Sequence, residues 1–206
     1  DRLDYYYNLE GVRMSCVTED SAGNLYVGTM NNGLYMIDHN KKWLNYFPKK
    51  DITCIYEDSK KSIWVGTKDD GLFRLDRTGG ITNYGTASHQ NMLSSNYVRC
   101  ILEDDLGNYW IGTFKGLDKL DVTTGNLIHY SKDNKPYSLS NSSIICMMKD
   151  RQGTFWIGTY YGGVNLFNPD YEIYTYYYPD ESQKGKLTSP FAGRMTEDSN
   201  GGIWIA

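Results

Sequence analysis

The chain has 206 residues, a formal net charge of −4, 40% hydrophobic and 15% aromatic residues, with 19 Tyr and 21 Gly. This content supports a packed core and excludes a disordered chain. There is no basic cluster of the kind that nucleic-acid binding requires. No stretch approaches the roughly 20 apolar residues of a membrane helix, and with no signal peptide in the sequence we expect a cytoplasmic chain or one already trimmed of its signal peptide.

One motif recurs along the chain and predicts a repeat protein. Each copy begins with Glu-Asp or Lys-Asp, and an aromatic residue follows six positions after the Asp. In four of the copies, Gly-Thr comes shortly after the aromatic residue. The repeat aromatics are Tyr26, Trp64, Trp110, Trp156 and Trp204. We expect each of them to be largely buried between blades, and the glycine after them to mark the close approach of a neighbouring blade. The runs between them are short and apolar or alternating, bounded by Gly, Asn and Asp, which is typical of strands and not of a helical solenoid.

Taken in chain order, the sequence opens with an orphan fourth strand at 3–6, followed by four copies of a four-stranded meander. In the third copy, the predicted strands are 98–102, 109–113, 117–121 and 127–130. The chain then ends inside the second strand of a fifth copy, at 204–206. Four-stranded antiparallel meanders are the blades of a β-propeller, so we predict an all-β propeller domain over 1–206. We also expect it to be a piece of a longer protein, because an end in mid-strand would leave an exposed edge.

Four cysteines occupy one position of the repeat, ten residues before each repeat aromatic; these are Cys16, Cys54, Cys100 and Cys146. Arg194 has this position in the fifth copy. Equivalent positions on packed sheets are about 10 Å apart, which is too far for a disulfide. We therefore expect four free, buried thiols. No CxxC pair or Cys-His spacing indicates zinc, and no metal or cofactor is predicted.

The repeat resembles the two-component regulator propeller family. The resemblance rests on Ile55–Asp58, Ile63–Thr67 and Asp70–Asp76, and on the similar segments Leu93–Asn96 and Leu139–Ser142. Departures are Tyr26 in place of Trp, Lys149 in place of Glu, and one missing residue in the third Gly-Gly-Leu turn. The resemblance implies seven-bladed propellers in the periplasmic sensor region of hybrid two-component proteins of gut bacteria, which respond to carbohydrate breakdown products. It specifies the fold and transfers no binding residue.

No catalytic constellation stands out in the sequence. His39, His89 and His129 lie in three different contexts, and we interpret them as isolated surface residues. The Glu-Asp pairs recur in every blade, which indicates turn capping and not acid–base catalysis. The chain is therefore not predicted to be an enzyme.

Candidate ligand-binding residues lie in the loops that precede the first strand of each blade and in the turns between the second and third strands, because these share one face of a propeller. They are Arg13, Asn31, Asn32, Asp69, Asp70, Tyr97, Lys115, Tyr160, Tyr161 and Arg194. Aromatic faces with planar polar partners suit sugars, and the paired tyrosines depart from the repeat. We hypothesise a periplasmic sensor that binds an oligosaccharide here or at an interface with the rest of the chain, and that acts as a homodimer. The alternatives are a lyase- or glycosidase-like propeller enzyme and a protein-interaction scaffold.

Overall fold

The computed structural model describes residues 11–85, 92–133, 138–168, 173–179 and 187–206. The predicted strand at 3–6 and His89 lie outside these residues. Within them the chain forms strands and turns and contains no helix, as the alternating pattern predicts.

Each repeat folds into one antiparallel sheet whose strands follow chain order. The first blade consists of β1 (Arg13–Glu19), β2 (Leu25–Met30), β3 (Leu34–Ile37) and β4 (Trp43–Tyr46). The second consists of β5 (Ile52–Glu57), β6 (Ile63–Thr67), β7 (Leu72–Leu75) and β8 (Ile81–Asn83). The third consists of β9 (Val98–Glu103), β10 (Tyr109–Thr113), β11 (Leu117–Leu120) and β12 (Leu127–Tyr130). The fourth consists of β13 (Ile144–Lys149), β14 (Phe155–Thr159), β15 (Val164–Asn168) and β16 (Ile173–Tyr177). The fifth sheet has two strands, β17 (Met195–Glu197) and β18 (Ile203–Ile205).

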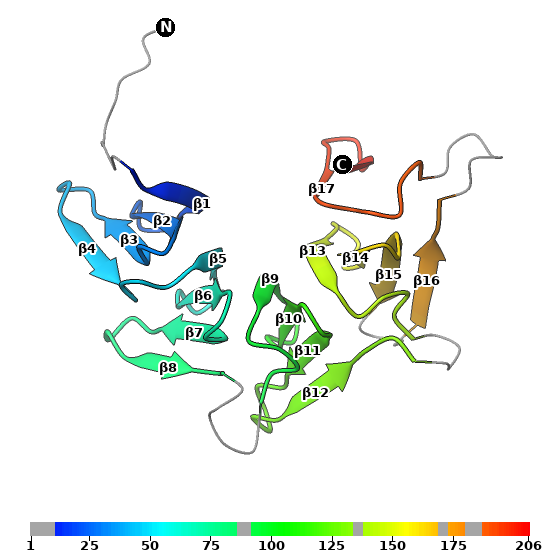
Figure 1. The fold of residues 1–206 in the computed structure, drawn as a ribbon, viewed down its shortest axis with the longest axis horizontal. Coiled ribbons are helices and arrows are strands. Elements are labelled where there is room, and N and C mark those ends of the chain that lie inside the picture. The colour runs from blue at the N-terminus through cyan, green and yellow to red at the C-terminus, as the bar shows by residue number, and fades with distance from the viewer. Residues whose placement is uncertain (1–10, 86–91, 134–137, 169–172, 180–186) are drawn as a thin grey trace, which may run out of the picture.

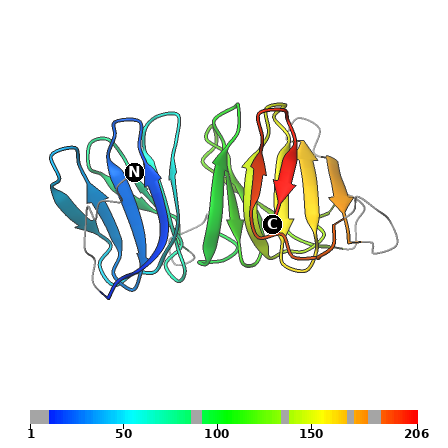
Figure 2. The same cartoon turned by 90° about the horizontal axis from the view of Figure 1, so that it is seen from above.

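The blades stand side by side in an arc (Figure 1). The first strands β1, β5, β9, β13 and β17 line its concave side, and the fourth strands lie on the outside. Viewed from above, the strands run between two opposite faces where the turns gather (Figure 2). The prediction of a β-propeller built from four-stranded blades is confirmed.

Among the described residues, the core lies between blades and forms three clusters. The cluster between the second and third blades joins Trp64 and Leu72 to Val98, Ile101 and Tyr109. The rings of Trp64 and Tyr109 are 4.3 Å apart between centroids. Because each blade buries its apolar residues against its neighbours, a single blade has no core of its own.

The glycine of the Gly-Thr motif allows this close packing. A Cβ atom at Gly112 would lie 2.5 Å from the Cys100 Sγ atom and 2.7 Å from Cγ2 of Ile144 in the next blade. The threonine after it closes the turn, since the Thr113 hydroxyl donates to the Gly116 carbonyl oxygen at 2.9 Å. The prediction that this glycine marks the approach of a neighbouring blade is confirmed.

The aspartate of each repeat caps its own turn, and in the second to fifth copies it also accepts the indole N–H of the repeat tryptophan. In the third blade, Asp104 Oδ1 accepts the backbone N–H of Leu106 and of Asn108 at 3.0 and 2.8 Å. Its Oδ2 accepts the indole N–H of Trp110 at 3.0 Å. This explains the spacing of six residues that defines the repeat, and turn capping is correct for the aspartate.

The glutamate of the pair has a different role, because it reaches back to the preceding blade instead of capping its own turn. Glu57 accepts hydrogen bonds from the backbone N–H and the hydroxyl of Ser21, at 2.8 and 2.7 Å. In the fourth blade, the cation Lys149 replaces this glutamate, and its partner in the preceding blade is the carboxylate of Asp105: the Lys149 ammonium lies 2.6 Å from Asp105 Oδ1. The departure at Lys149 is thus matched by a carboxylate, Asp105, where the first and second blades have serine.

Burial of the repeat aromatics depends on the next blade. Tyr26, Trp64 and Trp110 are buried, Trp156 is half-buried, and Trp204 is 66% exposed. The expectation that every repeat aromatic is buried is therefore wrong for the last two copies. The sheet that follows Trp156 has only two described strands, and Tyr177 of its own blade stacks on its ring at 6.1 Å. No blade in the described residues covers Trp204.

Candidate ligand-binding face

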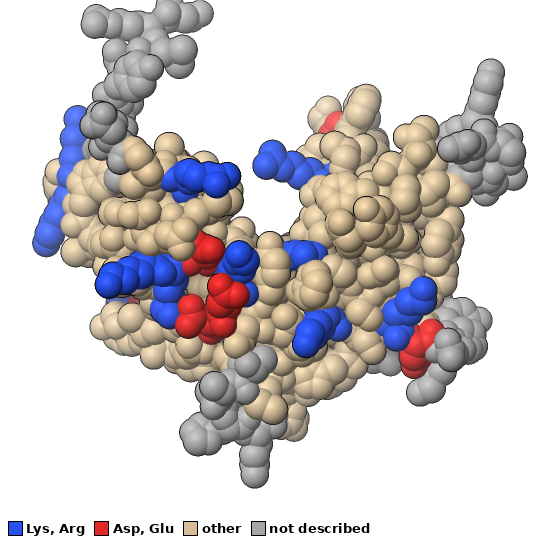
Figure 3. All heavy atoms as spheres, viewed as in Figure 1, with Lys and Arg blue, Asp and Glu red and all other residues tan. Residues whose placement is uncertain are grey.

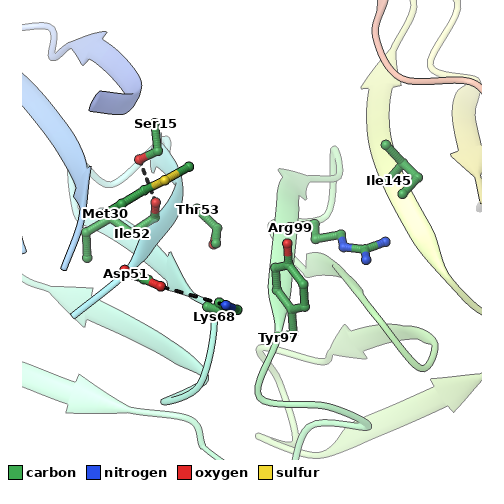
Figure 4. Close-up of a pocket in the computed structure, with 9 residues that line it drawn as sticks. All are labelled: Ser15, Met30, Asp51, Ile52, Thr53, Lys68, Tyr97, Arg99 and Ile145. Carbon is green, nitrogen blue, oxygen red and sulfur yellow. Dashed lines mark hydrogen bonds and ion pairs between the residues drawn. The ribbon is translucent and has the colours of Figure 1, made fainter. Parts of the chain in front are cut away.

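A hollow of about 470 Å³ lies on the concave side of the arc and is lined by residues of the first four blades (Figure 4). Its walls come from two repeat positions, the residue that precedes the cysteine and the residue that follows Gly-Thr, together with neighbouring side chains. The lining residues are Ser15, Met30, Asp51, Ile52, Thr53, Lys68, Tyr97, Arg99 and Ile145.

The side chains that precede the cysteines connect successive blades. The hydroxyls of Ser15 and Thr53 each donate to a backbone carbonyl of the next blade's first strand, at 2.6 Å. Arg99 does the same in the third blade, where Nη1 donates to the Ile144 carbonyl oxygen and to the Ser143 hydroxyl, both at 3.0 Å. The fourth blade has Ile145 here, which has no polar group to donate.

Arg99 lies against two aromatic rings. Its guanidinium carbon is 4.6 Å from the ring centroid of Tyr97 and 5.1 Å from that of Phe114. Those two rings stack, 6.2 Å apart and 18° from parallel. Figure 4 shows the guanidinium extending from β9 toward β13, across the hollow. Cation–π contacts of this kind hold a guanidinium in a fixed orientation.

Further aromatic side chains continue this surface across the fourth and fifth blades. Tyr160 and Tyr161 meet edge to face at 4.3 Å, and Tyr160 meets Phe191 at 5.8 Å. We call Tyr97, Phe114, Tyr160, Tyr161 and Phe191 the aromatic strip. Phe114, Tyr160, Tyr161 and Phe191 are all exposed, although aromatic rings are normally buried. A hydrogen bond with Tyr161 raises the pKa of Tyr160, while the positive charge of Arg99 lowers it.

Tyr161 has a left-handed backbone conformation, with φ of 64°. Asn31, at the same position of the first blade, has φ of 65°. Asparagine tolerates this region, whereas a bulky aromatic residue is strained there. Strained residues in turns are often found at functional sites.

The second blade supplies charged groups at the other wall. Asp51 accepts the backbone N–H of Asn31 at 2.5 Å, and its Oδ2 is 4.0 Å from the Lys68 ammonium. Asp70 is paired with Lys50 at 2.7 Å. Figure 3 shows the acidic group over the second blade and basic side chains on both sides of the hollow.

The structure brings together only some of the predicted residues. Of them, Tyr97 lines the hollow, and Tyr160 and Tyr161 lie on the same surface beside it. Arg13, Asp69, Lys115 and Arg194 are exposed but do not line it, and neither do Asn31, Asn32 and the paired Asp70. The strand register makes Tyr160, which follows Gly-Thr directly, equivalent to Met30, Lys68 and Phe114, so Tyr161 is the residue equivalent to Asn31, Asp69 and Lys115.

Sequence reasoning missed Arg99, Lys68, Phe114 and Phe191. A signal for three of them was present, because the residue immediately after Gly-Thr and the residue immediately before Cys vary while their neighbours recur. The hollow is lined at the first of these positions by Met30 and Lys68, and at the second by Ser15, Thr53, Arg99 and Ile145. Phe191 precedes the first strand of its blade, as Tyr97 does.

All four cysteines are free. Each residue as a whole is half-buried, less than we predicted, because the first strand borders the hollow. The thiols are nevertheless desolvated: burial raises the pKa of Cys54 to about 12 and that of Cys146 to about 11. They are therefore weak nucleophiles at neutral pH.

The described residues hold no group of three or more His, Cys, Asp or Glu side chains arranged for a metal ion. Of the histidines, His39 is exposed, and His129 is not isolated as predicted: its Nδ1 is 2.6 Å from Oδ1 of the buried Asp118. Neither histidine lines the hollow. Within the part of the chain that the structure covers, no helix could cross a membrane.

Comparison with known families agrees with this geometry. The two component regulator propeller pattern matches residues 46–69, 92–115 and 138–161. The chain carries two-component regulator propeller repeats. Each match begins before a blade's first strand and ends in the turn that follows its Gly-Thr, the region that forms the inner half of the blade. None of the curated proteins matches the chain significantly.

Solved structures share this fold. The extracellular domain of BT3049 from B. thetaiotaomicron, assigned as a hybrid two-component system, has a TM-score of 0.80 and 26% identity over 97% of this chain. Another such domain, of BT4673 from the same organism, has a TM-score of 0.63 and 19% identity over 93%. Virginiamycin B lyase from Staphylococcus aureus has a TM-score of 0.74 and 14% identity over 96%. The chain spans 27%, 34% and 64% of these three chains, respectively.

Proposed function

We propose that this chain is part of the ligand-sensing propeller of a two-component signalling protein, located in the periplasm, and that its loop face binds an oligosaccharide. The family repeats and the similarity to the extracellular domain of BT3049 support the sensor role. The observation that carries the binding role is the aromatic strip, which exposes four large rings beside a hollow.

The chemistry of the strip suits a sugar. Aromatic faces give apolar contact to the C–H side of a pyranose ring, and hydroxyl and guanidinium groups donate hydrogen bonds to its oxygens. Tyr160 and Tyr161 offer both kinds of contact from one turn. A binding role without catalysis also agrees with the absence of a His, Cys or acid–base set among the side chains that line the hollow.

Signalling would follow from a change in packing. The concave side joins the first strands of successive blades through single hydrogen bonds such as that from Thr53 to Val98. A ligand that contacts two or three blades binds one relative arrangement of the blades more tightly than another. This difference in affinity between the two arrangements is what shifts the sensor from one to the other. In a paired sensor, this difference would reach the other subunit through the remainder of the chain.

The test is calorimetric titration of the complete extracellular region with an oligosaccharide panel, for the wild type and the Tyr160→Ala/Tyr161→Ala variant. We expect binding to weaken by about tenfold or more if each lost ring contributes an ordinary aromatic contact. Tyr178→Ala is the control, because Tyr178 is exposed to a similar degree on the outer side of the fourth blade. Unchanged affinity in a folded double variant would move the site to an interface with the rest of the chain. Absence of any glycan binding would favour a protein-interaction scaffold, and turnover of a bound glycan would favour an enzyme.

A further inference from the structure

Arg99 differs from Lys50 and Lys68, the two lysines of the neighbouring second blade, because it has no acidic partner. Lys50 pairs with Asp70, and Lys68 lies near Asp51. No carboxylate among the described residues lies within 4.0 Å of the Arg99 guanidinium. Its polar contacts are the Ser143 hydroxyl and the Ile144 carbonyl oxygen, both made by Nη1. Nε and Nη2 thus have no hydrogen-bond acceptor in the described part of the chain.

The guanidinium is also held in place. Arg99 is half-buried, its Nη1 is fixed to the fourth blade, and the stacked rings of Tyr97 and Phe114 lie beside it. A planar guanidinium with one fixed nitrogen and two free N–H directions matches the two oxygens of a carboxylate or a sulfate group. A half-buried charge that lacks a counter-ion is costly, so an anionic ligand would gain by supplying one.

The surrounding charges support this direction. The hollow is lined by two cations, Lys68 and Arg99, and by one carboxylate, Asp51. The carboxylate is held at the opposite wall by the Asn31 backbone N–H and by Lys68. Of the three charged side chains that line the hollow, Arg99 is therefore the one whose charge no neighbouring side chain neutralises.

We propose that the hollow is an anion subsite, in which Arg99 binds a carboxylate or sulfate group of the ligand. This rests on the proposed function and refines it: the oligosaccharide is an acidic one. Its charged group would lie on Arg99 between the third and fourth blades, while neighbouring sugar rings contact the aromatic strip. Arg99 would then serve two roles, since the same side chain ties the third blade to the fourth.

The test compares matched glycans on an array, acidic oligosaccharides and the same oligosaccharides with the carboxylate methyl-esterified or the sulfate removed. The complete extracellular region is used as the wild type, Arg99→Gln and Arg99→Lys. We expect the wild type to prefer the acidic form, and Arg99→Gln to lose about tenfold or more in affinity for it, because a hydrogen bond between charged groups is lost. Arg99→Lys should retain part of the preference, since it keeps the charge but not the planar fork.

A second measurement separates this subsite from sugar recognition. Thermal unfolding in sodium sulfate is compared with sodium chloride of equal ionic strength. Sulfate stabilises proteins generally by exclusion from their surface, so Arg77→Gln, an exposed arginine outside the hollow, supplies the background. The anion subsite predicts a larger sulfate-induced rise in Tm for the wild type and Arg77→Gln than for Arg99→Gln.

The outcomes are distinct. Binding of neutral and acidic glycans with equal affinity, unaffected by Arg99→Gln, would overturn the anion subsite and leave the oligosaccharide sensor intact. A sulfate effect that depends on Arg99 without any glycan binding would keep the subsite and overturn the sugar ligand. If no glycan binds and the sulfate effect is the same in all variants, both proposals are wrong.

Discussion

Trp110 and Trp204 occupy the same position of the repeat but differ in what covers them, so they form a matched pair for mutation. Both indoles donate to the aspartate six residues earlier, at 3.0 and 2.9 Å. Trp110 is 1% exposed and packs on Phe167 at 4.8 Å, whereas Trp204 is 66% exposed. The difference between the two substitutions by alanine therefore measures inter-blade packing.

We expect Trp110→Ala to cost about 4 kcal/mol or more of unfolding free energy. Truncation of a buried aromatic residue costs about 3–5 kcal/mol, and the buried Asp104 carboxylate also loses a hydrogen-bond donor. Trp204→Ala in the same 206-residue chain should cost less than about 1 kcal/mol, because an exposed side chain contributes little burial. The measurement is urea unfolding followed by circular dichroism, in which Trp110→Ala should shift the midpoint by more than about 1 M. Equal costs for the two variants would show that the blades are not held together by these residues.

The remaining predictions concern packing, surface charge and pH. Gly112→Ala should cost about 1–3 kcal/mol in urea unfolding, because the new Cβ would lie 2.5 Å from Cys100 Sγ; a neutral result would contradict the close approach of blades. Lys149→Glu should lower stability slightly by facing Asp105, and adding Asp105→Ser should restore it by recreating the serine–glutamate pair of other interfaces; failure of this rescue would contradict a stabilising contact between blades at this position. Burial raises the pKa of Asp118, so its ionisation opposes folding as pH rises from about 4 through that raised pKa. The unfolding free energy of Asp118→Asn, relative to that of the wild type, should therefore increase as the pH rises through this range. A relative decrease would contradict the raised pKa of Asp118.

The natural precedent for the last substitution lies in the fourth blade. Asn165 occupies the position of Asp118 and holds the segment Leu139–Ser142, which precedes β13. It accepts the backbone N–H of Ser140 at 2.9 Å and donates to the Ser140 hydroxyl at 2.8 Å. Asp118 accepts both the backbone N–H and the hydroxyl of Ser94, each at 2.9 Å. An asparagine can therefore replace this aspartate and lose only the contact with His129.

Much of the fold follows from the sequence because the same motif, with the same strand pairing, recurs in every blade. The predicted strands of the third blade, 98–102, 109–113, 117–121 and 127–130, agree with β9 to β12 within one residue at each end. A single copy of this pattern would leave the pairing open. Four copies constrain it, since the same Gly, Thr and Asp must meet the same partners in every blade.

The site was harder to predict, because its parts are far apart in sequence and vary between copies. Arg99 and Tyr160 are 61 residues apart, and the charge of Arg99 influences Tyr160 only because the third and fourth blades pack against each other. Burial of Trp204 was also mispredicted, because it depends on the neighbouring blade and not on the repeat itself. The glutamate of the Glu-Asp pair was misread for the same reason, since its partner lies in another copy.

The repeat divides its residues between two tasks, and this division explains where ligand preference can change. The fixed positions are committed to turns and to contacts between blades: aspartate holds tryptophan, glycine admits the next blade, and the threonine hydroxyl closes the turn. The residue after this threonine has a backbone that its neighbours fix and a side chain that packs on no interior. It is Met30, Lys68, Phe114 or Tyr160 in successive blades. Because this side chain is exposed and lies outside the core clusters between blades, substitution there changes the loop face at little cost in stability. A propeller built in this way can acquire a new ligand one blade at a time.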